Sequence, residues 1–425
     1  MQLDPAAAAP AGSPGLPSIR ERLNRAALGL LLLPAAASAQ DPATNQLDVT
    51  ALLYGEQGRA QVWEPVVRAS RLFGNGQSLA GQLTVDVITG ASPSGALPSG
   101  EVQTSTSPSG NVTTIPAGAI PLTDFSDRRV ALDGEWVLPF GRFTTTTLGA
   151  HASHEKDYDS AGVNGRFSFE LMQKLLTLTV GGGVNEDSVS PIGGTPDGLS
   201  DGTVTYDRSN SKRSTSLLLG MSRVLTRRWV VGLDGTRTDE SGYLTEPYKL
   251  LSQMDPATGM PVGQLTDKRP SSRSRNSLLA SSAYHFSRDI LYSSYRYYWD
   301  SWDVQSHTLD LKYRHDLEDD WYVEPHLRLY QQSAATFYVG GLVDGAPLPN
   351  FATADYRLGD LTTITVGTTF AFHILDSPSQ WTVRAEYIRQ AGDSSPPGVI
   401  GVQRGFDLAP PIDTISVVFG YSLPF

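Results

Sequence analysis

Ser306 and His307 are adjacent, and Asp300 and Asp303 precede them closely, so this segment holds the residue types of a serine hydrolase. Such a hydrolase needs the serine hydroxyl within hydrogen-bond reach of the histidine ring. If residues 304–315 form one β-strand, neighbouring side chains point to opposite faces and these two cannot meet. We therefore predict no catalytic residue here, and His307 is expected to be an interfacial or loop-packing residue near a strand end.

An acidic, glycine-rich segment is a second candidate, because carboxylate oxygens are the ligands that calcium prefers. Its spacing matches neither an EF-hand loop nor a nonapeptide calcium repeat. An ordinary solvated loop is favoured, so we predict no metal and no cofactor. The segment spans residues 186–207 and its acidic residues are Glu186, Asp187, Asp197, Asp201 and Asp207.

The composition excludes several classes of protein. The chain contains no cysteine, which excludes disulfides, zinc–thiolate sites, haem attachment and cysteine nucleophiles. A net charge of -11 argues against nucleic-acid binding, which needs a basic face.

The largest set of candidate residues consists of charged side chains in segments where the residues alternate. Charged and polar residues occupy every second position, and apolar residues occupy the positions between them. Charges of both signs facing a lumen could fill it with salt bridges, or line a pore of weak selectivity. The pore is favoured, because the strand alternation predicts a β-barrel of about sixteen strands, which is too wide for side chains to close. The lumen-lining candidates are Glu64, Arg68, Asp86, Arg129, Asp133, Glu135, Arg166, Glu170, Arg296, Asp310, Lys312, Arg314, Glu324, Arg328, Arg384 and Glu386.

The elements that position these charges are strands, because polar and apolar residues alternate with period two along many segments. We predict an all-β fold, a transmembrane antiparallel up-and-down β-barrel of about sixteen strands. Fourteen strands is the alternative, with the two N-terminal segments as a plug. The predicted strands are 46–55, 60–72, 78–90, 126–138, 143–154, 159–170, 175–187, 213–224, 229–241, 275–286, 290–301, 304–315, 321–335, 359–374, 381–391 and 412–425.

A soluble β-sandwich is the competing interpretation, and the connections argue against it. Aromatic residues gather near strand ends, as in 295–299 and 321–322, where a membrane barrel has its girdles. Short connections alternate with longer ones, as periplasmic turns and extracellular loops do. The short ones are 139–142, 171–174, 225–228, 287–289, 316–320 and 375–380, and the long ones are 91–124, 188–212, 242–274, 338–357 and 392–411.

The last predicted strand shows the alternation most clearly and ends on an aromatic residue. In both respects it resembles the C-terminal strand of bacterial outer-membrane barrels, which the insertion machinery recognises. Ser416 falls on the polar parity of this strand. The predicted assembly signal consists of Val417, Phe419, Tyr421, Leu423 and Phe425.

Residues 1–39 have the layout of a secretory signal peptide, with Arg20 and Arg25 ahead of an apolar run at 26–37 and small residues up to Ala39. The run is shorter than the roughly twenty residues of a membrane-spanning helix. We expect cleavage near Ala39, a barrel over residues 40–425 and a location in the cell outer membrane.

The loop 243–274 is long, contains several prolines and ends in a cationic run that includes Lys268, Arg269, Arg273 and Arg275. Two interpretations stay open: a loop that folds inward as a constriction or lid, and a plain surface loop.

Several strings in this chain together resemble an uncharacterised family of bacterial outer-membrane β-barrels, known as domain of unknown function 3570. The resemblance covers nearly all of the chain after residue 39. It implies an outer-membrane barrel and no established activity. The resemblance further implies a gene neighbourhood with a small lipoprotein, a thioredoxin-like protein and a flavin-attaching transferase, which suggests extracytoplasmic redox work. The strings span 86–95, 242–249, 269–275, 295–302, 306–308 and 333–338.

The predicted function is a channel or transport-type pore of unknown substrate, without enzymatic activity. The alternative is a scaffold for a redox partner, either a lipoprotein or a thioredoxin-like protein, as the resemblance suggests. An outer-membrane hydrolase is the weakest of the three. Expected partners are outer-membrane lipid, lipopolysaccharide and the insertion machinery, and no nucleic acid.

Overall fold

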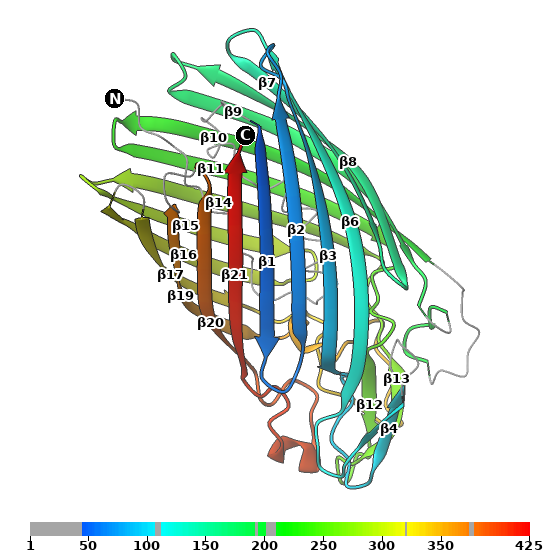
Figure 1. Ribbon diagram of the computed structural model, residues 1–425. Helices are drawn as coiled ribbons and strands as arrows, with labels where there is room; N and C mark the ends of the chain where they lie inside the picture. Colours follow the sequence, from blue (N-terminus) through cyan, green and yellow to red (C-terminus); the bar gives the residue numbers. More distant parts are fainter. Residues whose placement is uncertain (1–44, 107–111, 192–193, 201–209, 319–320, 374–377) are drawn as a thin grey trace.

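The computed structural model describes residues 45–425, apart from 107–111, 192–193, 201–209, 319–320 and 374–377 (Figure 1). The predicted signal peptide, and Asp201 and Asp207 of the acidic segment, lie outside the described residues.

Sixteen strands of the described chain form one closed antiparallel barrel (Figure 1), which confirms the predicted fold. In barrel order the wall strands are β1 (Gln46–Glu56), β2 (Gln61–Leu72), β3 (Ser78–Pro93), β6 (Leu122–Phe140), β7 (Thr144–His154), β8 (Tyr158–Leu171), β9 (Leu176–Val189), β10 (Asn210–Thr226), β11 (Trp229–Gly242), β14 (Ser272–His285), β15 (Asp289–Asp300), β16 (Gln305–Glu318), β17 (Trp321–Gln332), β19 (Leu361–His373), β20 (Gln380–Gly392) and β21 (Ile412–Pro424).

The first and last wall strands pair with each other and close the barrel. Leu53 of β1 lies opposite Val417 of β21, and Ala51 lies opposite Phe419. The N–H of Phe425 donates to the carbonyl oxygen of Asn45 at 2.8 Å, which continues the pairing to the end of the chain. Both N-terminal segments therefore belong to the wall, and the alternative of a fourteen-stranded barrel with a plug is wrong.

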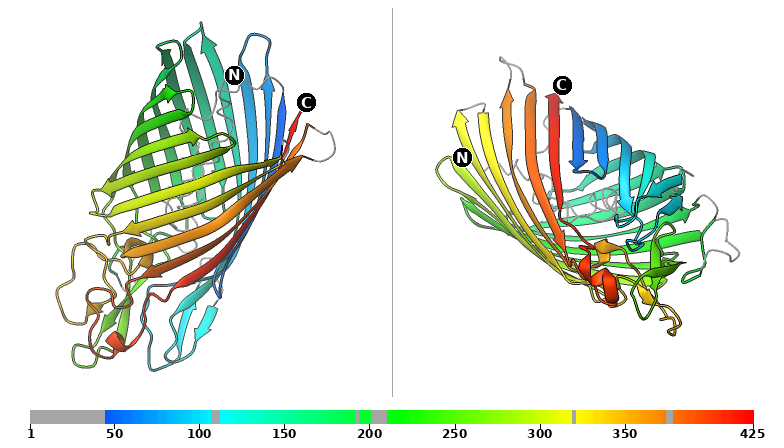
Figure 2. Two further views of the ribbon diagram at one scale, coloured as in Figure 1. Left: turned by 90° about the vertical axis from the view of Figure 1, so that its left-hand side faces the viewer. Right: turned by 90° about the horizontal axis from the view of Figure 1, so that it is seen from below.

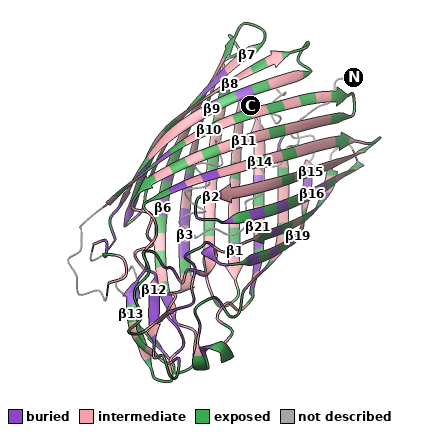
Figure 3. Cartoon of the chain, turned by 180° about the vertical axis from the view of Figure 1, so that it is seen from behind, coloured by how far each residue is buried: buried purple, intermediate pink, exposed green. Residues whose placement is uncertain are grey.

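The outer surface of the wall is apolar. Leu132, Val163 and Phe419 are 61%, 65% and 47% exposed, whereas Ser416 and Gly420, on the inward parity of the same strand as Phe419, are buried. Figure 3 shows exposed and covered residues alternating along the strands. An apolar belt of this extent suits lipid rather than water, and closure leaves no unpaired strand edge in the membrane. This is the architecture of an outer-membrane barrel.

Aromatic side chains occupy both ends of the wall strands. Trp321 stacks on Phe372 with ring centroids 5.2 Å apart, near the end where the chain termini lie. Tyr297 stacks on Trp299 at 5.3 Å, near the opposite end. These positions match the girdles of a membrane barrel.

The connections differ between the two ends. Near the termini they are short turns, and in the β8–β9 turn Met172, Gln173 and Lys174 all have left-handed backbone conformations, with φ of 50°, 56° and 71°. The described parts of the long connections lie at the opposite, extracellular end (Figures 1 and 2); these connections are 94–121, 190–209, 243–271, 333–360 and 393–411. No helix in the described residues is long and apolar enough to span a membrane.

The extracellular loops contain short elements that period-two alternation did not reveal. They form a hairpin of β4 (Gln103–Thr106) and β5 (Val112–Ile115), and a small sheet in which β12 (Leu250–Met254) pairs with both β13 (Pro261–Thr266) and β18 (Leu342–Val343). In the described part of the loops, 3₁₀ turns η2 (Tyr356–Leu358) and η3 (Gly401–Gly405) accompany them.

Candidate functional site in the lumen and at the extracellular mouth

The structure places all of the predicted lumen-lining charges within the described wall strands, on the inward parity, where each is buried or half-buried. By strand they are Glu64 and Arg68 on β2; Asp86 on β3; Arg129, Asp133 and Glu135 on β6; Arg166 and Glu170 on β8; Arg296 on β15; Asp310, Lys312 and Arg314 on β16; Glu324 and Arg328 on β17; and Arg384 and Glu386 on β20.

Several of these charges pair between wall strands that are adjacent or are separated by one other strand. Arg129 donates to Asp86 with Nε and Oδ2 2.6 Å apart, and both side chains are almost fully buried. Arg68 and Glu135 approach to 3.4 Å. These ion pairs link wall strands to one another on the inner face, and they make that face strongly polar.

The densest group on the wall centres on His326 of β17. Its Nε2 lies 3.0 Å from Asp310 Oδ2 and its Nδ1 lies 2.8 Å from Glu386 Oε1. If both carboxyl groups are ionised, both contacts are hydrogen bonds only when both ring nitrogens carry a proton. The arrangement therefore suits an imidazolium between two carboxylates. Arg328 also approaches Asp310 at 3.3 Å.

A glycine makes the second of these contacts possible. Gly367 of β19 lies opposite both His326 and Glu386 in the register, between the strands that carry them. A Cβ at Gly367 would lie 2.5 Å from Glu386 Cγ. Glu386 is among the predicted lumen-lining residues and His326 is not, although both fall on the polar parity of their strands. A lone histidine at such a position gives no sign of its partners.

Other inward charges use partners that the sequence did not suggest. Asp133 lies 2.7 Å from the ring nitrogen of His151 on β7. Glu170 pairs with Lys174 of the β8–β9 turn at 2.7 Å. Arg314 pairs with its strand neighbour Asp316 at 2.8 Å. The salt-bridge interpretation of the inward charges therefore describes much of the wall.

The Ser306–His307 pair does not form a hydrolase site. Ser306 is buried on the inward face of β16, and His307 is exposed on the outer face. The ring of His307 lies 2.6 Å from the hydroxyl of Tyr295 and packs beside Tyr297. His307 is thus part of the aromatic surface near the extracellular end.

The acidic segment does not gather its described carboxylates. Glu186 faces outward and pairs with Arg213 at 3.2 Å, whereas Asp187 faces inward and pairs with Lys212 at 3.3 Å. Carboxylates instead gather where β6 meets the β7–β8 turn: ligand oxygens of Asp127, Glu155 and Asp157 lie within 4.8 Å of one another. The members of this group come from separate elements, so no single acidic stretch of the sequence contains them.

The loop 243–271 crosses the extracellular mouth. It leaves the wall between β11 and β14, yet Lys249 Nζ donates to Ser92 Oγ at 3.3 Å and Leu250 N–H donates to the carbonyl of Ser94 at 2.8 Å. Ser92 lies at the end of β3 and Ser94 directly follows this strand, whereas β11 is separated from β3 by β6, β7, β8, β9 and β10. The structure thus favours the loop that folds inward over the plain surface loop.

Six charged residues, which we call the mouth cluster, join this loop to the loop 333–360. Arg269 donates to Asp267 Oδ2 at 2.7 Å and to Asp355 Oδ2 at 2.8 Å. The three cations and three carboxylates balance in charge. The members of the mouth cluster are Glu246, Lys249, Asp267, Arg269, Asp355 and Arg357.

Burial and neighbouring charges shift the titration of the mouth cluster. Burial lowers the pKa of Lys249 to about 8 and raises the pKa of Asp267. Burial would also raise the pKa of Asp355, but Arg357, Lys249 and Arg269 hold it well below its usual range. Asp355 is therefore the anionic centre of the cluster.

An aromatic cluster lies beside the mouth cluster. The Arg273 guanidinium lies 4.2 Å above the ring centre of Trp302 and donates to Asp300 at 2.9 Å. The strand predicted over 321–335 ends at Gln332, because Ala335 and Phe337 leave the wall to pack against Trp302. The buried members of the cluster are Trp302, Val304, Ala335, Phe337, Tyr338 and Leu358.

The loop 393–411 forms hydrogen bonds with two other loops. Val402 N–H donates to the carbonyl of Thr258 at 3.0 Å. The side-chain amide of Gln403 donates to the carbonyl of Pro98 at 2.8 Å, and Gln403 itself is fully buried. Together with the mouth cluster, these bonds join the loops into one interlocked cover over the mouth, which we call the cap.

The family model described as "Protein of unknown function (DUF3570)" matches residues 21–423. No curated protein matches the chain.

Among solved structures, the chain is similar to the toluene transporter TodX of Pseudomonas putida, with 12% identity, 93% of each chain covered and a TM-score of 0.41. It is also similar to OccK3 of Pseudomonas aeruginosa, with 8% identity, 89% of this chain and 95% of the other covered, and a TM-score of 0.38. A third similar structure is the siderophore receptor PirA of Pseudomonas aeruginosa, with 8% identity, 89% of this chain and 61% of the receptor covered, and a TM-score of 0.43.

Proposed function

Starting from the family described as "Protein of unknown function (DUF3570)", to which this chain belongs, we propose that the protein is a gated outer-membrane pore. The observation that carries the proposal is the polar and charged inner face of a closed barrel, covered at one end by its own loops. Side chains do not fill a barrel of this size, so solutes have room to pass once the loops permit it.

The mixed signs of the lining charges predict weak ion selectivity. Pairs such as Asp86–Arg129 place opposite charges side by side, so no ring of a single sign forms around the described wall. In this proposal the lining residues conduct solutes and carry out no reaction. Export with removal of residues 1–39 near Ala39 is part of the same proposal.

The cap supplies the gate. Its parts come from distant positions around the wall and are joined by buried ion pairs and backbone hydrogen bonds. Removing one partner of a buried ion pair destabilises the folded arrangement by several kcal/mol. The cap therefore keeps one arrangement until these contacts break. The described structure corresponds to the covered arrangement.

Single-channel recording in planar bilayers tests the proposal. Wild-type protein is expected to give small, infrequent conductance steps, and a variant in which residues 245–268 are replaced by a short Gly-Ser linker is expected to give larger, persistent steps. Replacement of the exposed loop tip 345–349 is the matched control and should behave like wild type. If all three proteins insert, as judged by their heat-modifiable bands, and all are electrically silent, the pore proposal fails.

A further inference from the structure

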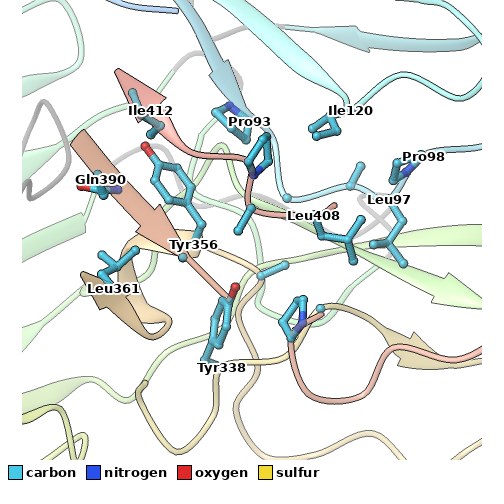
Figure 4. A pocket seen from close by; sticks show the side chains of 18 of the residues that line it. Pro93, Leu97, Pro98, Ile120, Tyr338, Tyr356, Leu361, Gln390, Leu408 and Ile412 are labelled. Atoms are coloured by element: carbon cyan, nitrogen blue, oxygen red, sulfur yellow. The ribbon is translucent and has the colours of Figure 1, made fainter. Parts of the chain in front are cut away.

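A small cavity lies beneath the cap, against the inner wall at the extracellular end (Figure 4). The wall side includes Leu361, Gln390 and Ile412, from the ends of β19, β20 and β21. The cap side includes Leu97 and Leu408, from two different loops. The cavity therefore exists only where the cap rests on the wall.

Most of the lining is apolar and rigid. Prolines and aliphatic side chains surround the space, and the rings of Tyr338 and Tyr356 face it from one side (Figure 4). The space open to the centres of water-sized molecules is about 50 Å³. One water needs roughly 10–15 Å³ by this measure, so the cavity holds a few waters or one small ring.

Four polar side chains of the lining have groups without a hydrogen-bond or ion-pair partner among the described residues. Oε1 of Gln390 is buried without a hydrogen bond to any described residue, and Gln390 is only 2% exposed. The hydroxyls of Tyr338 and Tyr356 form no hydrogen bond with the described residues. Arg59 has no ion pair within the described chain, and its guanidinium lies 5.6 Å from the ring centre of Tyr356. A buried acceptor left unmatched costs free energy, so this site favours an occupant that donates to it.

We propose that this cavity binds a small ring-bearing carboxylate that also carries a hydroxyl group. The guanidinium of Arg59 matches the carboxylate, the apolar lining matches the ring, and Gln390 Oε1 accepts from the hydroxyl. The tyrosine hydroxyls supply further donors to the carboxylate. The inference deepens the proposed function, because it names a substrate class for the pore at its extracellular mouth.

Isothermal titration of the purified barrel in detergent tests the site, with 4-hydroxybenzoate as the probe. Saturable binding is expected. Phenol, which lacks the carboxylate, and acetate, which lacks the ring, should each bind at least tenfold more weakly. Benzoate, which lacks the hydroxyl, should also bind more weakly. Equal, non-saturable heats for all four compounds would overturn the inference.

Substitutions test which lining residue contacts which group of the probe. Arg59→Gln should lower affinity for 4-hydroxybenzoate at least tenfold, and Arg59→Lys should restore part of it through the retained charge. Gln390→Leu should abolish the preference for 4-hydroxybenzoate over benzoate. Arg404→Gln is the matched control, since Arg404 lies on the same cap and does not line the cavity. Affinity unchanged in folded Arg59→Gln and Gln390→Leu proteins would refute the assignment.

The two proposals fail separately. A barrel that conducts in bilayers but binds no probe refutes the cavity site and leaves the pore intact. A barrel that binds the probe but never conducts refutes the pore and leaves the cavity as a binding site.

Discussion

His326 on β17 reaches Glu386 on β20 across an intervening strand, with Nδ1 and Oε1 2.8 Å apart. The contact passes over Gly367 of β19, the residue between them in the register. Side chains usually meet only those on adjacent strands, so the missing side chain extends the network over one more strand. Charges on β16, β17 and β20 thereby form one group on the inner wall.

Gly367→Ala should break this contact. The new Cβ would lie 2.5 Å from Glu386 Cγ and 2.6 Å from the carbonyl oxygen of Ala385, so Glu386 must move away from His326. Loss of a hydrogen bond between charged, mostly buried groups costs on the order of 2 kcal/mol. Thermal unfolding of the purified barrel should therefore occur at lower temperature.

Gly81→Ala, also on a wall strand, is the control because a Cβ there meets nothing within 4 Å. Equal stability of the two variants would show that the His326–Glu386 contact contributes nothing.

Arg269→Met should loosen the cap. The substitution leaves Asp267 and Asp355 buried with less compensating charge, and breaking a buried pair in this way costs roughly 3–5 kcal/mol. The folded barrel should become sensitive to protease within residues 245–268 and should open more often in bilayers. Arg237→Met removes an exposed pair with Asp239 and should change neither property. Protease resistance of the Arg269 variant equal to that of wild type would contradict the role of the mouth cluster.

Lys249 should make cap closure depend on pH. Its pKa is about 8 in the closed cap and ordinarily about 10.5, so between these values the open form binds more protons than the closed form. Closure is therefore stabilised as pH rises through this window and weakened as pH falls toward 8, by up to about 3 kcal/mol in all. The open fraction in bilayers should fall between pH 8 and 10.5. Lys249→Met should remove this part of the pH dependence, and an unchanged profile would count against it.

Two adjacent residues of the C-terminal strand should respond differently to substitution by arginine. Val417 faces lipid opposite Leu53, and Ser416 faces the lumen opposite Tyr54. An arginine facing lipid near mid-bilayer costs roughly 2–4 kcal/mol, so Val417→Arg should impair assembly whereas Ser416→Arg should insert normally. Deletion of Phe425 should also impair assembly. Heat-modifiable bands of outer-membrane fractions provide the measurement, and the reverse order of the two arginine variants would invert the assigned faces.

The alternation in the sequence was sufficient to predict the wall strands. Each wall strand has one face in lipid and one in the lumen, which gives a strict period of two. That period located the strands, the inward charges and the outward position of His307. The partners of the charges were not predictable, since pairing depends on register: Gly367 between His326 and Glu386 carries meaning only once three strands are aligned.

The loops lack such a period, so their arrangement stayed beyond sequence reasoning. The family-like strings 86–95, 242–249, 269–275, 295–302 and 333–338 converge at the mouth, where the mouth cluster and the aromatic cluster join them. The contacts between these strings join separate loops and strand ends, so the alternation within a strand could not predict them. The redox partner implied by the family resemblance stays a prediction, and purification from native membranes with a lipoprotein or thioredoxin-like protein would support it.

The bond between Gln403 and Pro98 joins residues 305 positions apart, and it sets an order of events in biogenesis. Contacts of such separation form slowly, because nearly the whole chain must be in place before they stabilise anything. The cavity beneath the cap includes Pro98 from one loop and Leu408 from another that precedes only β21. A nascent or truncated barrel therefore has no ligand site, and binding of the probe would report that translocation, strand closure and loop docking are all complete.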